Sequence, residues 1–433
     1  MTAVAAVRRQ VRLCIGKAGL PVGSLAYVRQ GRRENSAFAY DAAWLSNPSR
    51  FNVSADLQLI AGHQPHKAAS PHDSVFHGAI ADTAPDAWGR RVIARDHAKR
   101  RRAEPHLPAL TELDYLLAVD DFSRVGALRL CDTEGTWQRT VDKGRRSTPP
   151  LIELERIYLA SRAVERGQES AEDLRYLQGK GTSLGGMRPK CTLVDEDGWL
   201  AIGKFPSMGD SRSVTRGEVL ALKLAAQAGI DAAAARIVLL GERGNAVPVA
   251  VIRRFDRDAE DGRIPYQSAA TLLQASREEE RSYAEIADAI RSHSHAPTAD
   301  VRQLWRRLVF NLLIANVDDH LQNLGFLHVE RGLWRLAPAF DINPFPDRER
   351  ESKTWLTEQD GPITDVQMLL ARASYFALDE AQALTVLGEV HAAVANWRRI
   401  ALGPEVGLRA VELDDFAPAF EHEQMDAVAA LLG

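Results

Sequence analysis

Apolar residues recur at helical spacing in three stretches of the C-terminal half of the chain. In one of them Leu304, Leu308 and Leu312 follow one another at intervals of four residues. Side chains at this spacing share one face of a helix, and such a face packs against a core. The N-cap of the last stretch is expected at Asp379. The predicted helices are residues 283–291, 301–314 and 379–402.

Shorter runs rich in β-branched and aromatic residues predict strands. Two pairs of runs are separated by short polar segments, which is typical of β-hairpins. The turns fall at Asp195–Gly198 and Glu330–Gly332, and Lys204 lies near the end of the second strand of the first hairpin. The predicted strands are residues 191–194, 199–206, 247–252, 324–329 and 333–337.

Glycine, proline and charged residues interrupt the apolar pattern between Asp132 and Pro150. Such residues favour turns and loops, so we expect a domain boundary in this segment. The sequence then divides into a mixed α/β subdomain (1–150), a β-rich segment (151–256) and a helical segment (257–433). This succession of strands and helices predicts an α+β fold.

The composition is that of an ordinary globular protein. Of the 433 residues 45% are hydrophobic and 26% are charged, which allows more than one core to be buried. The formal net charge of -4 argues against a protein that mainly coats nucleic acid. Neither a signal peptide nor an apolar run that could span a bilayer is evident. The three cysteines lie far apart, which suits a reducing compartment, so we expect a cytoplasmic protein without a membrane partner.

Residues 316–323, which read Asn-Val-Asp-Asp-His-Leu-Gln-Asn, carry the strongest chemical signal. Asn323 lies five residues after Asp318, and Asp341 lies beyond the second predicted hairpin. In kinases this layout lets one carboxylate align the attacking hydroxyl, while an amide and a second carboxylate hold Mg²⁺ beside the phosphates. Asp318 is thus the candidate base, and Asn323 and Asp341 are the candidate metal ligands. Taken alone, the segment is equally compatible with a helix cap and a turn.

A glycine-rich segment, residues 181–190, precedes the first predicted hairpin. Its glycines would let backbone N–H groups approach phosphate oxygens closely, and Arg188 and Lys190 would supply positive charge. The segment matches neither the dinucleotide-binding pattern nor the P-loop pattern. A plain turn between strands is therefore the competing interpretation.

Lys204 occupies a strand position after the glycine-rich segment, where kinases keep the lysine that grips the α- and β-phosphates. A solvated strand lysine would have the same local sequence. Glu218 lies in the helical run 217–226 that follows, where it could pair with the lysine or complement the helix macrodipole from the first turn. The sequence leaves that role open.

Together these segments resemble the HipA family, the serine/threonine protein kinases that act as toxins in bacterial toxin-antitoxin pairs. The resemblance implies a protein-kinase-like two-lobed fold, in which the N-terminal subdomain precedes a β-rich N-lobe and a helical C-lobe. The matching motifs keep their order over the whole chain. They are residues 38–40, 85–91, 183–190, 254–257, 316–323 and 340–342.

The resemblance also implies residue roles, with ATP and Mg²⁺ as cofactors. Asp318 would be the catalytic base, and Asn323 and Asp341 would hold the metal. Ser183 would be autophosphorylated, with Thr182 as a second candidate acceptor, and the added charge would repel ATP. Asp319 receives no catalytic role. The residues expected to bind ATP are Lys204, Arg253, Phe255, His320, Ser183, Gly185 and Gly186.

Partners follow from the same resemblance. It implies a HipB-like helix-turn-helix antitoxin, contact with operator DNA only through the antitoxin complex, and a cytosolic protein substrate. The implied substrate class is an aminoacyl-tRNA synthetase, whose phosphorylation would inhibit translation and growth and so link the protein to persistence. Two alternatives stay open, because fold does not fix function: a small-molecule phosphotransferase, and a nucleotide-binding scaffold without turnover.

Two other features of the N-terminal subdomain have simpler interpretations. The basic run 99–102 is more typical of a solvated helix end than of a nucleic-acid contact. Four histidines lie among prolines and small residues, and their wide spacing favours an irregular loop over a zinc site. These histidines are His63, His66, His72 and His77.

Overall fold

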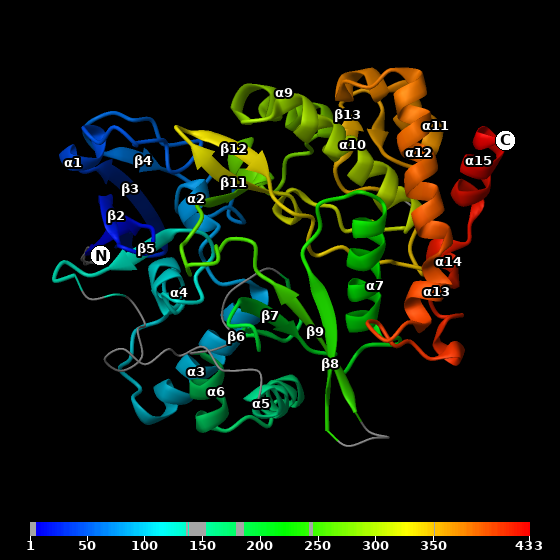
Figure 1. Ribbon diagram of the computed structural model, residues 1–433. Helices are drawn as coiled ribbons and strands as arrows, with labels where there is room; N and C mark the ends of the chain where they lie inside the picture. The colour runs from blue at the N-terminus through cyan, green and yellow to red at the C-terminus, as the bar shows by residue number, and fades with distance from the viewer. Residues whose placement is uncertain (1–5, 136, 138–152, 179–185, 242–245, 350) are drawn as a thin grey trace. The chain divides into compact units, whose positions relative to one another are not determined.

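The structure is a computed structural model that describes residues 6–135, 137, 153–178, 186–241, 246–349 and 351–433. Helices and strands are both abundant (Figure 1), and the expected α+β class is confirmed. The expected boundary between Asp132 and Pro150 falls mostly outside the described residues. The division into residues 1–150, 151–256 and 257–433 therefore stays a prediction.

The chain forms two compact units. The first comprises Met1–Gly203, Asp256–Glu278 and Glu330–Gly332, and the second comprises Lys204–Phe255, Glu279–Val329 and Leu333–Gly433.

The elements of the first unit are β1 (Val7–Ile15), β2 (Leu20–Gln30), β3 (Arg33–Tyr40), α1 (Ala42–Leu45), β4 (Gln64–His66), α2 (Gly78–Ala81), α3 (Ala87–Ala103), α4 (Glu112–Ala118), β5 (Leu128–Cys131), α5 (Leu154–Arg166), α6 (Ala171–Gln178), β6 (Lys190–Val194), β7 (Leu200–Lys204, which ends in the first residue of the second unit), β10 (Tyr266–Ser268) and α8 (Ala269–Leu272).

An antiparallel sheet with the strand order β4-β3-β2-β1-β5 organises the N-terminal part of the first unit. Val11 on β1 pairs with Leu25 on β2, which in turn pairs with Phe38 on β3. All three side chains are buried, and burial alternates along β2 and β3. One face of the sheet therefore carries the core, as the period of two along a strand requires.

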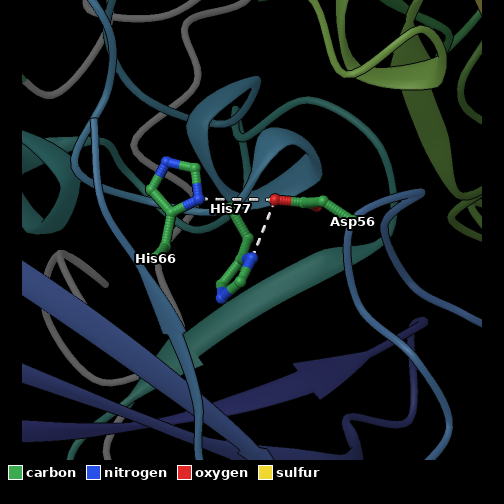
Figure 2. Close-up of side chains that lie close together, drawn as sticks. All are labelled: Asp56, His66 and His77. Atoms are coloured by element: carbon green, nitrogen blue, oxygen red, sulfur yellow. Dashed lines mark hydrogen bonds and ion pairs between the residues drawn. The ribbon is translucent and has the colours of Figure 1, made fainter. Parts of the chain in front are cut away.

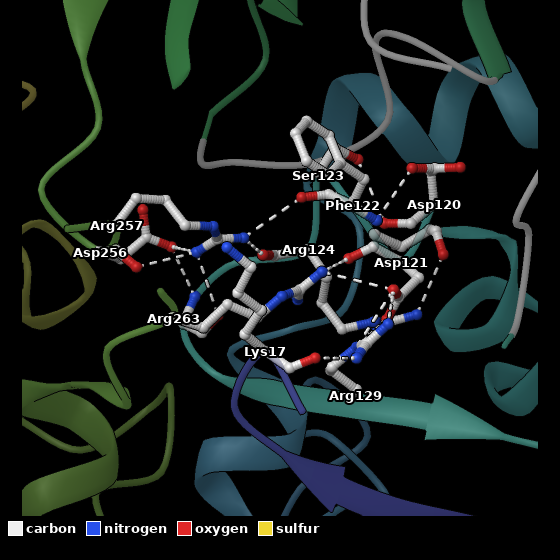
Figure 3. Close-up of polar contacts among 12 residues, drawn as sticks. Lys17, Asp120, Asp121, Phe122, Ser123, Arg124, Arg129, Asp256, Arg257 and Arg263 are labelled. Carbon is white, nitrogen blue, oxygen red and sulfur yellow. Dashed lines mark hydrogen bonds and ion pairs between the residues drawn. The ribbon is translucent and has the colours of Figure 1, made fainter. Parts of the chain in front are cut away.

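A network of charged side chains ties residues 256–263 to residues 120–129 within the first unit (Figure 3). Asp256 accepts a hydrogen bond from the backbone N–H of Gly126 at 2.7 Å and pairs with Arg257 at 2.8 Å. Asp121 pairs with Arg129 at 2.6 Å. Because these groups are buried, the charge balance among them is needed to offset their desolvation. Asp256 and Arg257, which belong to one of the recognised motifs, thus have a structural function.

The elements of the second unit are α7 (Val214–Gln227), β8 (Ala235–Leu240), β9 (Val247–Arg253), α9 (Tyr283–His293), α10 (Pro297–Leu313), η2 (Leu321–Asn323), β11 (Gly325–Glu330, whose last residue belongs to the first unit), β12 (Leu333–Leu336), β13 (Trp355–Thr357), β14 (Gly361–Pro362), α11 (Val366–Ala371), η3 (Ala373–Phe376), α12 (Glu380–Ala395), α13 (Trp397–Leu402), η4 (Ala410–Glu412), α14 (Ala417–Phe420) and α15 (Glu423–Leu432).

Helix α10 is the centre of the second unit and packs against α9 and α12 (Figure 1). Its buried residues include Leu304, Leu308 and Leu312, as the apolar spacing predicts. The helix begins at Pro297, four residues earlier than predicted, because proline is favoured in the first turn of a helix, where no N–H is required.

The predicted helix over residues 379–402 is two helices. Asp379 is the N-cap, as expected, and its side chain accepts a hydrogen bond from the backbone N–H of Gln382. The first helix ends at Ala395, and the second begins at Trp397, whose ring stacks on Phe420 with centroids 4.8 Å apart. Apolar spacing continues across the break, so the sequence pattern did not mark it.

Both predicted hairpins are confirmed. The first is formed by β6 and β7, and the second by β11 and β12. The second turns through Arg331 and Gly332, both with positive φ, which is the conformation that tight hairpin turns require. Among the described residues no helix has both the length and the apolar character needed to cross a membrane.

Candidate functional site

The loop that carries Asp318 begins where α10 ends. Ala315 has a φ of +51°, a left-handed conformation that ends the helix. Asn316 then donates from its side chain to the Asn311 carbonyl oxygen Oδ1 at 3.1 Å, and its own Oδ1 accepts from the backbone of Asn343 at 3.5 Å. These contacts fix the start of the loop within the second unit.

Asp319 anchors the middle of the same loop. Its buried carboxylate accepts hydrogen bonds from the Tyr283 hydroxyl and from the backbone N–H of Lys353, both at 2.7 Å. Its backbone oxygen accepts from the hydroxyl of Thr354 at 2.7 Å. Burial raises the pKa of Asp319, while these donors oppose the rise. The residue positions the loop, and sequence reasoning missed this because its partners lie 34 to 36 residues away.

Asp318, one position earlier, has a different environment. Its side chain is 35% exposed and forms an ion pair with the ammonium of Lys353. Its backbone oxygen accepts a hydrogen bond from Nδ2 of Asn323 at 2.8 Å. Two of the predicted site residues, Asp318 and Asn323, are therefore in direct contact.

Lys204 connects two carboxylates at the end of β7. Its Nζ lies 2.5 Å from Oε1 of Glu218 on α7 and 2.6 Å from Oδ1 of Asp341. Burial by itself lowers the pKa of Lys204, but the charges of Asp341 and Glu218 outweigh it and raise the pKa, so the amine stays protonated. Asp341 has a φ of +54°, a left-handed conformation that costs energy for a residue other than glycine.

The position of Glu218 settles the question that the sequence left open. Helix α7 begins at Val214, so Glu218 lies beyond the first turn and is buried against Lys204. The alternative in which it complements the macrodipole from the first turn is wrong. The ion pair with the strand lysine is the observed contact.

A small recess adjoins these groups in the second unit. Asn323, Asp341 and His320 line it, together with Phe340 and Ile342. Nδ1 of His320 is buried and has no hydrogen-bond partner among the described residues. The recess thus brings together three of the predicted site residues.

Arg253 and Phe255, two of the residues expected to bind ATP, also lie in the second unit. The backbone N–H of Arg253 donates to Ala234 at 2.8 Å, and the side chain of Arg253 is exposed. The ring of Phe255 lies 5.3 Å from that of Phe340, which directly precedes Asp341. Phe255 therefore packs beside the segment that carries a candidate metal ligand.

The glycine-rich segment is only partly described. Ser183, Gly185 and the neighbouring Thr182 lie outside the described residues. Gly186 is described and has a φ of +93°, which favours glycine. Its carbonyl oxygen accepts a hydrogen bond from the backbone of Trp88 at 3.3 Å.

Lys190, which the sequence analysis expects to supply positive charge to this segment, lies beside Gly186 and pairs with a carboxylate. Its ammonium is buried and lies 3.0 Å from Oδ2 of Asp86 at the N-cap of α3. The pair lies within the first unit, where each buried group compensates the charge of the other.

Comparisons with known proteins identify the family and the fold. A family model for the HipA-like C-terminal domain matches residues 182–397, and one for the HipA N-terminal domain matches residues 15–121. The chain belongs to the HipA family. The C-terminal match includes Lys204, Asp318, Asn323 and Asp341.

Two relatives of this HipA-family chain are named as putative kinases. One, from Haemophilus influenzae, is 27% identical over 188 residues, which cover 39% of this chain and 55% of the relative. The other, putative kinase Y4mE from Sinorhizobium fredii, is 27% identical over 340 residues, which cover 72% of this chain and 73% of the relative. The chain thus spans little more than half the length of the first relative.

A solved structure has the same fold. It is the Shewanella oneidensis toxin-antitoxin complex of HipA, HipB and operator DNA, and the likeness has a TM-score of 0.65 and covers 97% of both chains. The sequence identity is 14%, so the likeness establishes the fold alone. The HipA-type, kinase-like fold expected from the sequence is confirmed.

Proposed function

We propose that this chain is an ATP-dependent serine/threonine protein kinase of HipA type. The observation that carries the proposal is the pairing of Lys204 with both Glu218 and Asp341 within 2.6 Å of a single ammonium group. An ion pair between a strand lysine and a helix glutamate is required in active protein kinases, where the lysine grips the nucleotide phosphates. A solvated strand lysine would have neither partner.

The chemistry of the metal candidates fits Mg²⁺. Nδ2 of Asn323 is occupied by the backbone oxygen of Asp318, which leaves the amide oxygen as the end that can serve as a ligand. Asp341 supplies a carboxylate in the same recess. One amide and one carboxylate suffice for Mg²⁺, which keeps water and phosphate oxygens as its other ligands. When bound, the ion would neutralise charge on the ATP phosphates.

The protein's own groups would divide the work of transfer. Lys204 would bind ATP phosphate, and Arg253, Phe255 and His320 would contact the nucleotide. Asp318 would take the proton of the attacking substrate hydroxyl. As it does so, the hydroxyl oxygen would bond to the γ-phosphorus and the bond between that phosphorus and ADP would break. The partial exposure of Asp318 leaves it accessible to a protein substrate.

We further propose that Ser183 is the autophosphorylation site and that Gly185 and Gly186 belong to the phosphate-binding segment. A phosphate on Ser183 adds about two negative charges and would repel the phosphates of ATP. Two observations support this proposal. The matching motifs keep their order along the chain, and Gly186 has a left-handed backbone conformation.

The proposed partners rest on family membership and on the related complex. A HipB-like antitoxin would bind this chain. Operator DNA would be contacted only through that complex. The substrate would be a cytosolic protein such as an aminoacyl-tRNA synthetase. The fold likeness to a protein solved with HipB and operator DNA supports the antitoxin. Co-expression with a neighbouring helix-turn-helix protein, followed by purification through a tag on one chain, tests this part.

Incubation of the purified chain with labelled ATP and Mg²⁺ tests the enzymatic proposal. Mass spectrometry should locate phosphate on Ser183, and the Ser183→Ala variant should lose it while folding normally. If the Ser183→Ala variant is still fully labelled, another residue accepts the phosphate, and Thr182 is the first candidate to test. Transfer to an aminoglycoside and not to protein would favour a small-molecule phosphotransferase, and ATP binding without any transfer would favour a scaffold.

A further inference from the structure

Three side chains from separate segments of the first unit converge near the start of α2. Figure 2 shows a ring nitrogen of His66 and one of His77 facing the same carboxylate oxygen of Asp56. Oδ2 of Asp56 lies 2.7 Å from Nδ1 of His77 and 3.5 Å from Nδ1 of His66. The three candidate ligand atoms all lie within 4.8 Å of one another.

The other nitrogen of each ring contacts a backbone carbonyl. Nε2 of His66 lies 3.2 Å from the carbonyl oxygen of Ser74, and Nε2 of His77 lies 3.1 Å from that of Gln64. A carbonyl oxygen only accepts, so each Nε2 must carry the hydrogen. In a neutral ring Nδ1 then has a lone pair, and here both lone pairs face a carboxylate. Such an arrangement requires a cation between the three groups, either a proton or a metal ion.

We propose that Asp56, His66 and His77 bind a divalent transition-metal ion, for which Zn²⁺ is the best match. Two imidazole nitrogens and one carboxylate oxygen form a familiar ligand set for such ions, with water as a fourth ligand. Histidine ligands commonly donate their second ring N–H to a backbone carbonyl, which is the contact that both rings make here. The expectation of an irregular loop without a metal site is therefore revised.

The carboxylate is held by Ser54 and Gly78, and the Ser54 hydroxyl contacts only Oδ1. Oδ1 of Asp56 accepts a hydrogen bond from the hydroxyl of Ser54, and the backbone nitrogen of Gly78 lies 3.3 Å from Oδ1 and 3.4 Å from Oδ2. Oδ2 faces the two rings. Neighbouring ligand atoms around a tetrahedral Zn²⁺ are roughly 3.3 Å apart, which follows from bonds of about 2.0 Å. Insertion of the ion thus needs the 2.7 Å contact to widen by about 0.6 Å and a separation of up to 4.8 Å to close by roughly 1.5 Å, by that same approximate geometry.

Burial gives the site both rigidity and access. The side chain of His77 is almost fully buried, whereas those of Asp56 and His66 are 18% and 25% exposed. Solvent can therefore reach the site from the side of His66 and supply the ion and its water. A bound ion would join the loop at Asp56, the end of β4 and the N-cap of α2.

Metal titration of the full-length protein tests this inference independently of kinase activity. The protein is first stripped with a chelator and then titrated with Zn²⁺ by calorimetry, with excess Mg²⁺ present to occupy sites built from hard oxygen ligands. We expect one equivalent of Zn²⁺ to bind and the melting temperature to rise. Co²⁺ in place of Zn²⁺ should give the visible absorption of a four-coordinate ion with nitrogen and oxygen ligands.

The chain offers matched control variants. His66→Ala should weaken Zn²⁺ binding by at least about 100-fold, since one of three protein ligands is lost. His63→Ala and His72→Ala remove exposed histidines of the same region and should bind as the unaltered protein does. Asp56→Asn changes a second proposed ligand and should also weaken Zn²⁺ binding. Circular dichroism shows whether each variant is folded.

Two outcomes would overturn the inference. If the stripped protein binds no Zn²⁺ in the presence of Mg²⁺, a proton bridges the three groups. If His66→Ala and Asp56→Asn are both folded and bind Zn²⁺ as tightly as the unaltered protein, the ion occupies a different site.

Discussion

Asp318 and Asp319 are adjacent in the sequence, yet their surroundings differ. Asp319 is buried and accepts hydrogen bonds from Tyr283 and from the backbone of Lys353. Asp318 stays partly exposed beside the Lys353 ammonium. A carboxylate that must take a proton from a substrate needs access, whereas one that positions a loop needs fixed partners. The contrast supports Asp318 as the proposed base and Asp319 as its support.

Replacement of the proposed base is the most direct test at the residue scale. Asp318→Ala should abolish phosphoryl transfer, with a loss of roughly 100-fold or more, while nucleotide binding stays largely intact. Single-turnover kinetics and nucleotide titration measure the two effects separately. Asp415→Ala, which alters an exposed aspartate of the same unit, should leave both unchanged. Wild-type transfer in Asp318→Ala would reject the assignment.

Asp82 should make stability depend on pH. Burial raises its pKa from 3.8 to about 6, although hydrogen bonds from Ser268 and Thr271 oppose the rise. Because the folded state holds this proton more tightly than the unfolded state, the contribution to stability is greatest below about pH 4. It is lost as the pH rises to about 6, on the order of 2 to 3 kcal/mol in all.

Urea denaturation at several pH values, with a chelator present, checks this expectation. The free energy of unfolding of the natural protein should fall relative to that of Asp82→Asn between about pH 4 and pH 6. Parallel pH profiles for the two proteins would show that Asp82 does not titrate in this range.

At the scale of elements, the buried pair of Lys190 and Asp86 holds β6 against the start of α3. Asp86 has two functions, because Oδ2 pairs with Lys190 at 3.0 Å and Oδ1 caps the helix by accepting from Gly89 at 2.6 Å. Asp86→Ala should lower the free energy of unfolding by about 3 to 5 kcal/mol, since it leaves an unpaired buried ammonium and an uncapped helix.

Asp86→Asn separates the two effects, because its amide oxygen can still cap the helix while the charge is lost. Most of the destabilisation should persist in this variant. Chemical denaturation of both variants measures the difference. If Asp86→Asn is as stable as the natural protein, the ion pair contributes nothing and Lys190 must be solvated on average.

At the scale of the whole molecule, Lys204, Glu218, Asn323 and Asp341 belong to one compact unit, so nucleotide should stabilise that unit. Mg²⁺-ATP at about 100 times its dissociation constant should add about 2.7 kcal/mol and raise the melting temperature of this unit by roughly 5 to 10 °C.

Asp341→Ala should retain only the part of this thermal shift that does not depend on Mg²⁺. Differential scanning calorimetry with ATP, in Mg²⁺ and in chelator, makes the comparison. An equal Mg²⁺-dependent shift in Asp341→Ala would exclude Asp341 as a metal ligand.

The periodic parts of the fold could be predicted from the sequence because they depend on neighbours along the chain. Apolar spacing of three to four residues indicated α10, and polar turns between apolar runs indicated both hairpins. The order of the motifs indicated the family and the residues of the site. The prediction of a single helix over residues 379–402 was wrong, because the apolar pattern continues across the break between α12 and α13 and no glycine or proline marks it.

Only the tertiary structure decided which side chains meet. Lys204 pairs with Asp341 across 137 positions, His77 meets Asp56 across 21, and Lys190 is buried against Asp86 across 104. No local pattern encodes such contacts, because they arise when separate elements pack and buried charges must find partners. The sequence by itself therefore determined the family, the main elements and the candidate residues, and packing determined which of those residues share a site.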